Sequence, residues 1–213
     1  MTNFSNKNGS EILNVIIDVI IENKAYLSEI DGKIGDGDHG VNMAKGFKMA
    51  GQRLTGNESV SDALHILSDV LLTEIGGSMG PLYGTMFMEM AETIEDHDTI
   101  DAPLFSKMLQ SGLDGVMEIG GAKLGDKSLL DTLIPAIEAF NASIENGASF
   151  ESSLDALEKA AAIGRDSTID MISRIGRSSR LGERSRGVID AGATSCYLIL
   201  HSLSIQVKRH LSS

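Results

Sequence analysis

The densest group of chemically capable side chains lies between residues 31 and 39. Within these nine positions the chain carries Asp31, Asp36, Asp38 and His39, interspersed with glycines. Two carboxylates about 4 Å apart repel by roughly 4 kcal/mol at an effective dielectric constant of about 20, so three together call for a bound cation or large pKa shifts. The segment therefore predicts a site for a hard divalent ion, with a solvated acidic turn as the alternative.

The same segment argues against two common sites. Counting from Asp36, the twelfth position is Phe47, where an EF-hand requires a bidentate Glu, so Mg²⁺ that bridges to phosphates is favoured over an EF-hand calcium. Gly35, Gly37 and Gly40 match the G-x-G-x-x-G pattern. A dinucleotide fingerprint needs a preceding strand, whereas a helix is expected here, so the Rossmann interpretation is rejected.

Three further loops bear on an anion site. Gly76–Pro81 precedes an expected helix, whose N-terminal N–H groups can bind phosphate, although a plain helix cap is the alternative. Gly125–Ser128 by itself indicates only a charged turn with a cap serine. Five of the eight arginines lie within residues 174–186. Guanidinium groups bind phosphate oxygens well, so this segment predicts an anion-binding loop. The alternatives are a solvated basic loop and a docking site for an acidic partner.

The composition indicates an ordered cytoplasmic protein. The 213 residues are 42% apolar and 23% charged, which is enough for a sizeable core. No apolar stretch approaches the roughly 20 residues that span a bilayer, and the first ten residues lack a signal-peptide pattern. The formal net charge of −12 opposes binding to nucleic acid. The single Cys196 has no disulfide partner, which favours a reducing compartment.

Apolar residues recur at helical spacing in almost every segment, which predicts an all-α fold. The expected helices cover residues 10–29, 41–54, 59–76, a segment after Pro81, 102–119, 129–145, 150–175 and 192–211. Short connections make sequential helices antiparallel neighbours, so we expect one barrel of eight helices over residues 10–213, after a flexible tail over residues 1–9. Alternate connections then share a rim, where four glycine-marked loops could form one site: residues 30–40, 76–80, 120–128 and 176–192.

Four motifs in chain order resemble those of the nucleotide-binding L subunits of bacterial dihydroxyacetone kinases. They are Gly35–Gly40 with Asn42, Gly76–Thr85, Gly125–Ser128, and Leu181–Ser185 followed by Asp190–Ala193. The resemblance spans roughly residues 10 to 210. It implies a barrel of eight antiparallel helices with a nucleotide site at one rim.

The resemblance also implies the ligands and residues of that site. ADP, with ATP as its phosphorylated form, would bind together with two Mg²⁺ ions held by Asp31, Asp36 and Asp38. These aspartates and Arg177, which would offset developing charge, are the implied catalytic residues. The implied nucleotide pocket consists of His39, Gly40, Val41, Asn42, Ser78, Met79, Gly120, Leu129, Arg177, Asp190, Ala191 and Gly192. Ser78 and Met79 would offer backbone N–H groups, and Leu129 would flank the base.

As a phosphotransferase of this family, the chain would relay phosphate from an M-type phosphocarrier protein, through Mg-bound ADP, to dihydroxyacetone on a separate K-type subunit. Neither nucleic acid nor a membrane would take part, and a homodimer is compatible with the resemblance. Met79 stands where the family usually has Ser, and Gly187–Gly192 lacks the usual His and Pro. These departures keep two alternatives open: an ATP-dependent kinase subunit for a related ketose such as a tetrulose, and a nonenzymatic nucleotide-binding adaptor.

Overall fold

Amphipathic helices account for most of residues 2–211, the part of the chain that our computed structural model describes. The α-helices are α1 (Gly9–Glu22), α2 (Lys24–Ile34), α3 (His39–Arg53), α4 (Val60–Glu74), α5 (Met79–Ile94), α6 (Ala102–Gly120), α7 (Leu130–Glu145), α8 (Phe150–Ser167) and α9 (Ala191–His210). The shorter elements are β1 (Asn3–Ser5), β2 (Thr99–Asp101) and the 3₁₀-helices η1 (Asn6–Asn8), η2 (Thr168–Asp170) and η3 (Arg177–Ser185). The predicted all-α class is confirmed, because the strands found within residues 2–211 have three residues each.

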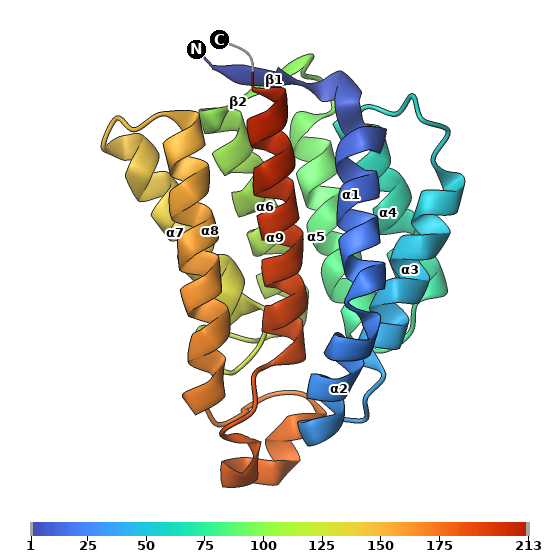
Figure 1. Ribbon diagram of the computed structural model, residues 1–213, viewed down its shortest axis with the longest axis vertical. Coiled ribbons are helices and arrows are strands. Elements are labelled where there is room, and N and C mark those ends of the chain that lie inside the picture. Colours follow the sequence, from blue (N-terminus) through green and yellow to red (C-terminus); the bar gives the residue numbers. More distant parts are fainter. Residues whose placement is uncertain (1, 212–213) are drawn as a thin grey trace.

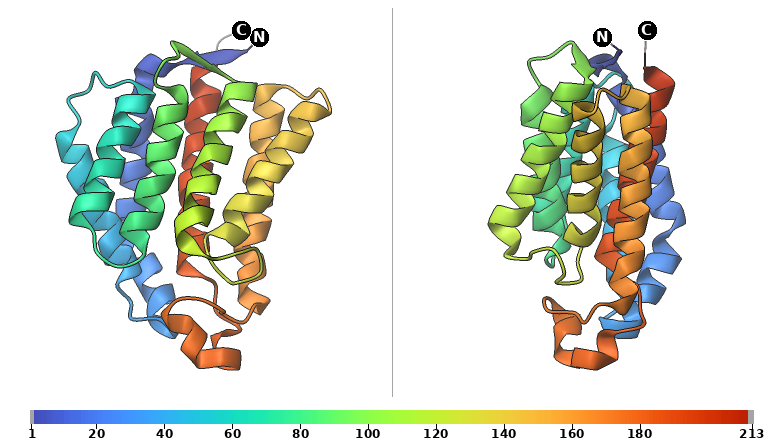
Figure 2. Two further views of the ribbon diagram at one scale, coloured as in Figure 1. Left: turned by 180° about the vertical axis from the view of Figure 1, so that it is seen from behind. Right: turned by 90° about the vertical axis from the view of Figure 1, so that its left-hand side faces the viewer.

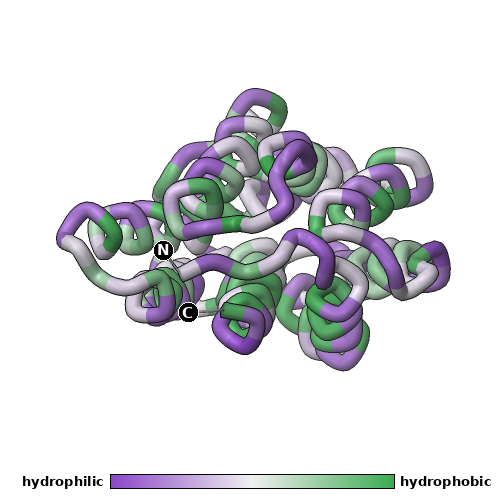
Figure 3. The backbone as a smooth tube through the Cα atoms, turned by 90° about the horizontal axis from the view of Figure 1, so that it is seen from above, coloured by the Kyte–Doolittle hydropathy of each residue, from purple (hydrophilic) through white to green (hydrophobic). Residues whose placement is uncertain are grey.

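Helices that follow one another in the chain pack against one another. From α3 to α9 each helix contacts the next, α9 contacts α1, and α1 contacts α3. Figures 1 and 2 show these helices side by side along the long axis, with both chain ends at the same end of the bundle. Figure 3, which looks along that axis, shows that the helices carry both hydrophilic and hydrophobic residues. Because sequential helices lie side by side, the loops that join antiparallel neighbours alternate between the two ends of the bundle.

Aromatic side chains gather in the part of the core nearest the chain ends. Phe105 lies between three other rings, with ring centroids 5.3 Å from Phe140, 5.4 Å from Phe150 and 6.4 Å from Phe4. All four rings are buried. Although aromatic residues make up only 4% of the chain, their edge-on and tilted contacts tie the first strand to three helices.

Two expected helices differ from the structure in length. The helix expected over residues 10–29 is broken at Asn23, whose backbone (φ −89°, ψ 6°) leaves the helical range and whose side-chain amide donates to the Val19 carbonyl oxygen at 2.8 Å. The helix expected over residues 150–175 ends at Ser167. There the Thr168 hydroxyl donates to the Arg165 carbonyl oxygen at 2.6 Å and accepts from the Asp190 N–H at 3.0 Å. This contact between distant residues redirects the chain towards α9.

The N-terminal residues differ from the flexible tail expected over residues 1–9. β1 pairs antiparallel with β2, with Phe4 opposite Ile100. The Asn6 amide donates to the carbonyl oxygens of Ile94 at 3.1 Å and His97 at 2.7 Å. Phe4 is only 1% exposed. One apolar ring and a buried amide are therefore enough to hold a segment whose composition is otherwise polar; residue 1 lies outside the described residues.

No helix within residues 2–211 is both long enough and apolar enough to cross a membrane.

We predict that Phe4→Ala lowers the free energy of unfolding by about 3–5 kcal/mol, because it removes a buried ring and leaves a cavity. Urea unfolding followed by circular dichroism measures this change. Ile163→Ala is the matched control, since Ile163 is 61% exposed and should change stability by no more than about 0.5 kcal/mol. Equal midpoints for Phe4→Ala and the unmodified protein would mean that the N-terminal segment is not part of the core.

Candidate functional site

The four glycine-marked loops meet at the end of the bundle opposite the chain ends (Figure 1). Residues from all four loops line one open cleft. The cleft encloses about 1010 Å³ of space including its open mouth. Its lining includes Asp31, Asp36, Asp38, His39, Asn42, Gly76, Gly77, Ser78, Met79, Lys127, Ser128, Leu129, Gly176, Arg177, Asp190, Ala191 and Gly192. Loops far apart in the sequence therefore share one site, as their alternation along the chain predicts.

Three carboxylates meet at one side of the cleft. Asp31 comes from the last turn of α2, and Asp36 and Asp38 come from the loop that leads into α3. One carboxylate oxygen from each lies within 4.8 Å of the others. This is the only such group of potential metal ligands within residues 2–211. The loop can fold back on α2 because Gly37 adopts a φ of 76°, which favours glycine.

Close packing of α3 on α2 holds this loop in place. A Cβ atom at Gly40 would lie 2.1 Å from the Lys24 carbonyl oxygen, so only glycine allows the two helices to approach this closely. The His39 N–H at the start of α3 donates to Asp31 Oδ2 at 3.3 Å. These two contacts fix the start of α3 against α2, and so fix the loop that carries Asp36 and Asp38.

The electrostatics of the cluster favour a cation. Burial, followed by repulsion from Asp36 and a hydrogen bond with it, raises the pKa of Asp38, and Asp31 adds to the effect. Arg177 opposes it, and its guanidinium group forms an ion pair with Asp36. Three hard oxygen donors that repel one another fit a divalent ion such as Mg²⁺.

A hydrogen-bonded chain of neutral side chains forms the next part of the wall. His39 Nε2 lies 2.9 Å from Ser195 Oγ, and that hydroxyl lies 2.7 Å from the Tyr83 hydroxyl. Tyr83 in turn donates to the Gly192 carbonyl oxygen at 3.2 Å. Burial lowers the pKa of His39 to about 4, despite the opposing charge of Asp31, so the ring is neutral at pH 7. The chain joins α3, α5 and α9 without placing another charge beside the aspartates.

The start of α5 supplies backbone donors. Gly77 has a φ of 76°, and α5 begins at Met79, so the first N–H groups of the helix have no partner within it. A Cβ atom at Gly80 would lie 2.3 Å from the Ile75 carbonyl oxygen, so this turn also depends on close backbone packing. Ser78 and Met79, with the two glycines before them, line the cleft, which suits an anion.

Lys127 is a cleft residue of the Gly125–Ser128 motif to which the sequence assigns no role of its own. Its backbone has a φ of 66° and its side chain is only 2% exposed. Its ammonium group donates to the carbonyl oxygens of Met171, Ser185 and Val188 at 3.2, 2.6 and 2.6 Å. A Lys in a glycine-rich turn usually faces solvent, so the residue type and its neighbours do not predict that this side chain is buried.

The start of α9 forms the floor of the cleft. Asp190 caps this helix by accepting a hydrogen bond from the Ala193 N–H at 2.8 Å. Burial raises the pKa of Asp190 to about 6, with smaller contributions from Asp131 and Asp31, while the Ala193 N–H and Lys127 act in the opposite direction.

Three of the predicted pocket residues lie outside the lining. Gly40 contributes close helix packing, and Val41 is 46% exposed on α3. Gly120 ends α6, where a Cβ atom would lie 3.0 Å from Cδ2 of Leu82, itself a cleft residue. The remaining nine predicted pocket residues all line the cleft.

Comparison with known proteins matches this arrangement to one family. The model of the family described as the DAK2 domain matches residues 33–204. The chain is 35% identical to the protein of Escherichia coli (strain K12) named PEP-dependent dihydroxyacetone kinase, ADP-binding subunit DhaL, over 90% of this chain and 92% of that one. It is 36% identical to the PTS-dependent dihydroxyacetone kinase, ADP-binding subunit DhaL, of Lactococcus lactis subsp. lactis (strain IL1403), over 86% of this chain and 88% of that one.

A solved structure shares the fold. The crystal structure of the dihydroxyacetone kinase from C. freundii in complex with AMP-PNP and Mg²⁺ superposes with a TM-score of 0.71 at 22% identity. The match covers 93% of this chain and 33% of the crystallised chain, so the present chain spans about a third of that larger protein.

The pKa of Asp190 leads to a prediction about stability and pH. Because folding raises this pKa from 3.8 to about 6, the contribution of Asp190 to stability is full below pH 3.8 and is lost as pH rises through about 6. Asp190→Asn keeps a helix-capping side chain and removes the titration. We expect the unmodified protein to lose up to about 3 kcal/mol more than Asp190→Asn between about pH 4 and pH 7.

Urea unfolding at a series of pH values measures this difference. Asp98→Asn, at an exposed position, is the control and should follow the curve of the unmodified protein. Parallel stability curves for Asp190→Asn and the unmodified protein would contradict the raised pKa.

Proposed function

The chain belongs to the DAK2 domain family, and from this premise we propose that it is the ADP-binding subunit of a dihydroxyacetone kinase. The observation that carries the proposal is one cleft in which an acidic cluster, a helix N-terminus and an arginine loop face one another. These features match the three needs of a nucleotide phosphate site, which are a metal, backbone donors and a cation. The near-complete coverage of relatives named ADP-binding subunits supports the same assignment.

We further propose that the helices form a closed barrel of eight, since α9 packs against α1. In this barrel α1 and α2 together count as one helix that is interrupted at Asn23. In this arrangement Asp31, Asp36 and Asp38 would hold two Mg²⁺ ions at the rim. Bound Mg²⁺ would neutralise phosphate charge, which is the main requirement of phosphoryl transfer. The same ions would offset the repulsion from Asp36 and Asp31, which adds to the effect of burial on the pKa of Asp38.

The chain's own residues would bind and orient the nucleotide. His39 and Asn42, with Gly40 and Val41 beside them at the start of α3, would lie along the phosphates, and the N–H groups at Ser78 and Met79 would donate to them. Leu129, which is 6% exposed, would flank the base together with Gly120. The turn Asp190–Gly192 would close the pocket at the start of α9.

Arg177 would supply an exposed positive charge at the cleft mouth. Its side chain is 67% exposed and reaches across the cleft to Asp36, so it can exchange a carboxylate for a phosphate oxygen without leaving the site. Because the nucleotide itself carries the transferred phosphate, no nucleophilic side chain is required.

The acceptor and the donor would be other proteins. We propose a K-type subunit that holds dihydroxyacetone, and a phosphocarrier that recharges bound ADP. The cleft is open, so a second chain can approach the phosphates directly. We place this assembly in the cytoplasm.

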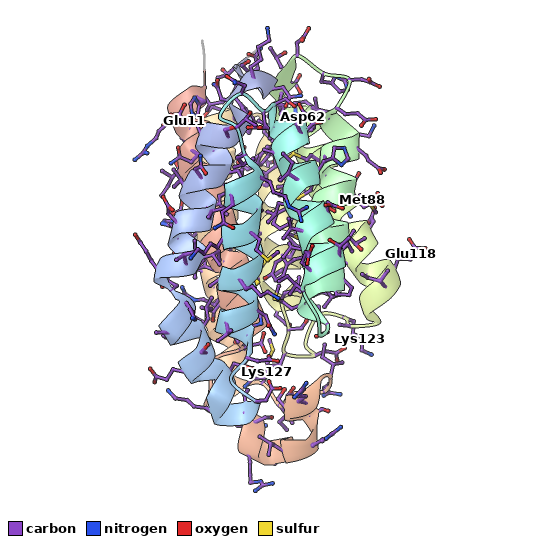
Figure 4. All side chains as sticks on the ribbon, turned by 90° about the vertical axis from the view of Figure 1, so that its right-hand side faces the viewer. Glu11, Asp62, Met88, Glu118, Lys123 and Lys127 are labelled. Carbon is purple, nitrogen blue, oxygen red and sulfur yellow. The ribbon has the colours of Figure 1, made fainter. Side chains whose placement is uncertain are left out.

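We predict that ADP binds in the presence of Mg²⁺ and that EDTA, or Asp38→Asn, weakens binding at least about tenfold, because the phosphates lose their counter-charge. Isothermal titration of the dialysed protein with ADP measures both effects. Asp62→Asn is the matched control, since Asp62 lies at the opposite end of the bundle (Figure 4). ADP affinity that is the same with Mg²⁺ and EDTA would contradict the proposed metal site.

A second experiment tests the relay. Protein loaded with ATP and separated from free nucleotide, then mixed with a K-type subunit and dihydroxyacetone, should form one dihydroxyacetone phosphate per bound nucleotide and then stop. Addition of the phosphorylated carrier should restore product formation. Continuous turnover on free ATP alone would instead identify a kinase that exchanges its nucleotide.

A further inference from the structure

Residues 171–188, which we call the arginine segment, form the part of the cleft that projects furthest from the bundle. The segment includes η3 and contributes Gly176, Arg177 and Ser178 to the cleft lining. Figure 1 shows it below the helices, between the end of α8 and the start of α9. Its five arginines are all exposed. A segment this polar cannot be held by apolar burial, so polar contacts must set its position.

One buried ammonium group joins the two ends of the segment. Lys127 Nζ donates to the Met171 carbonyl oxygen at the beginning of the segment and to those of Ser185 and Val188 near its end. These three bonds use all the donors of the ammonium group. Figure 4 shows Lys127 at the end of the bundle, next to the segment.

The turn that carries Lys127 is fixed from the other side. Asp131, which is 1% exposed, accepts hydrogen bonds from the N–H groups of Gly125 at 2.6 Å and Ser128 at 2.8 Å. Lys127 between them adopts a φ of 66°, a conformation that costs a non-glycine residue about 1 kcal/mol or more. A glycine at this position would avoid that cost, but it would lack the ammonium group that makes these hydrogen bonds.

Other contacts hold the segment together and join it to its neighbours. Ser185 Oγ accepts from the Ser173 N–H at 2.8 Å and donates to the Gly182 carbonyl oxygen at 2.6 Å. The Arg174 N–H donates to the Asp126 carbonyl oxygen at 3.1 Å.

Contacts outside residues 126 and 127 also hold the segment: the Gly187 N–H donates to the Ile169 carbonyl oxygen at 2.7 Å, the Arg186 guanidinium group donates to the Asp170 carbonyl oxygen at 2.6 Å, and Arg177 pairs with Asp36. To these contacts Lys127 adds hydrogen bonds from one ammonium group to both ends of the segment. Burial lowers the pKa of Lys127, and the charge of Asp190 opposes this shift.

We propose that Lys127 is a positioning residue that clamps the arginine segment over the acidic cluster, so that Arg177 is held where it meets Asp36 and the phosphates of a bound nucleotide. The clamp itself stands on the hydrogen bonds of this chain; its effect on nucleotide binding rests on the proposed function. Lys127 acts through the segment and through Arg177, without touching the nucleotide.

Limited proteolysis tests the clamp without any ligand. Trypsin cleaves after arginine, and the segment offers Arg174, Arg177, Arg180, Arg184 and Arg186. Lys127→Met keeps the apolar stem and removes the donors, so we expect cleavage within the segment to become roughly tenfold faster or more, as local opening becomes easier. Lys208→Met is the matched control, because Lys208 pairs with Asp155 at the far end of the bundle. Cleavage of Lys127→Met at the rate of the unmodified protein would overturn the proposal.

A double-mutant cycle tests the action through Arg177. Lys127→Met and Arg177→Gln should each weaken the binding of ADP in the presence of Mg²⁺. Because both changes remove the same contact, the affinity of the double variant for ADP should be no lower than that of the single variant with the lower affinity. A purely structural role for Lys127 would make the two losses multiply, and this result would overturn the proposal.

A second variant, Lys127→Gly, tests the clamp if Lys127→Met does not fold. Lys127→Gly relieves the left-handed backbone while it removes the clamp, and it should keep the helical circular dichroism of the unmodified protein but show the same fast cleavage. If the unmodified protein fails to bind ADP, the proposed function fails, whereas the proteolysis result still decides the clamp. Slow cleavage of a folded Lys127→Gly would overturn it.

Discussion

The repulsion among the carboxylates of Asp31, Asp36 and Asp38 is the constraint around which this end of the molecule is built. Their oxygens lie within 4.8 Å of one another, which costs electrostatic energy, and burial followed by this repulsion raises the pKa of Asp38. Each neighbour limits that cost: Arg177 pairs with Asp36, and the His39 N–H donates to Asp31. The His39 side chain stays neutral and reaches away to Ser195. A site that tolerates such repulsion is suited to binding a doubly charged cation.

The helical bundle makes this cluster possible by fixing where loops begin. Helix ends can carry polar groups that the core cannot, and the antiparallel order delivers every second loop to the same end. Glycines allow neighbouring helices to approach closely enough for these loops to share one cleft. At Gly40 and Gly164, a Cβ atom would lie 2.1 and 2.2 Å from carbonyl oxygens of Lys24 and Asp131. The high glycine content therefore reflects close backbone contacts as much as turns.

Buried polar groups then connect the loops in two different ways. The chain of His39, Ser195 and Tyr83 is neutral, so it can lie beside three aspartates without adding charge. Lys127 is cationic, and it is surrounded by carbonyl oxygens rather than by one carboxylate. The first arrangement ties helices to one another, and the second ties a polar loop to the bundle. Both depend on every donor having an acceptor, because an unpaired buried donor costs more than its hydrogen bond returns.

The helical class, the glycine-marked loops and the family could all be predicted from the sequence alone, because helical periodicity and contiguous motifs are local properties. The acidic cluster could be predicted because its members lie within eight residues. The packed Phe4 strand and the end of α8 at Ser167 could not, since each depends on partners far along the chain. Lys127 is the clearest case: in sequence it is one charged residue of a turn, and only the fold brings it under residues 171–188. A buried ion is defined by the acceptors that surround it, and those acceptors are backbone atoms that carry no sequence signal.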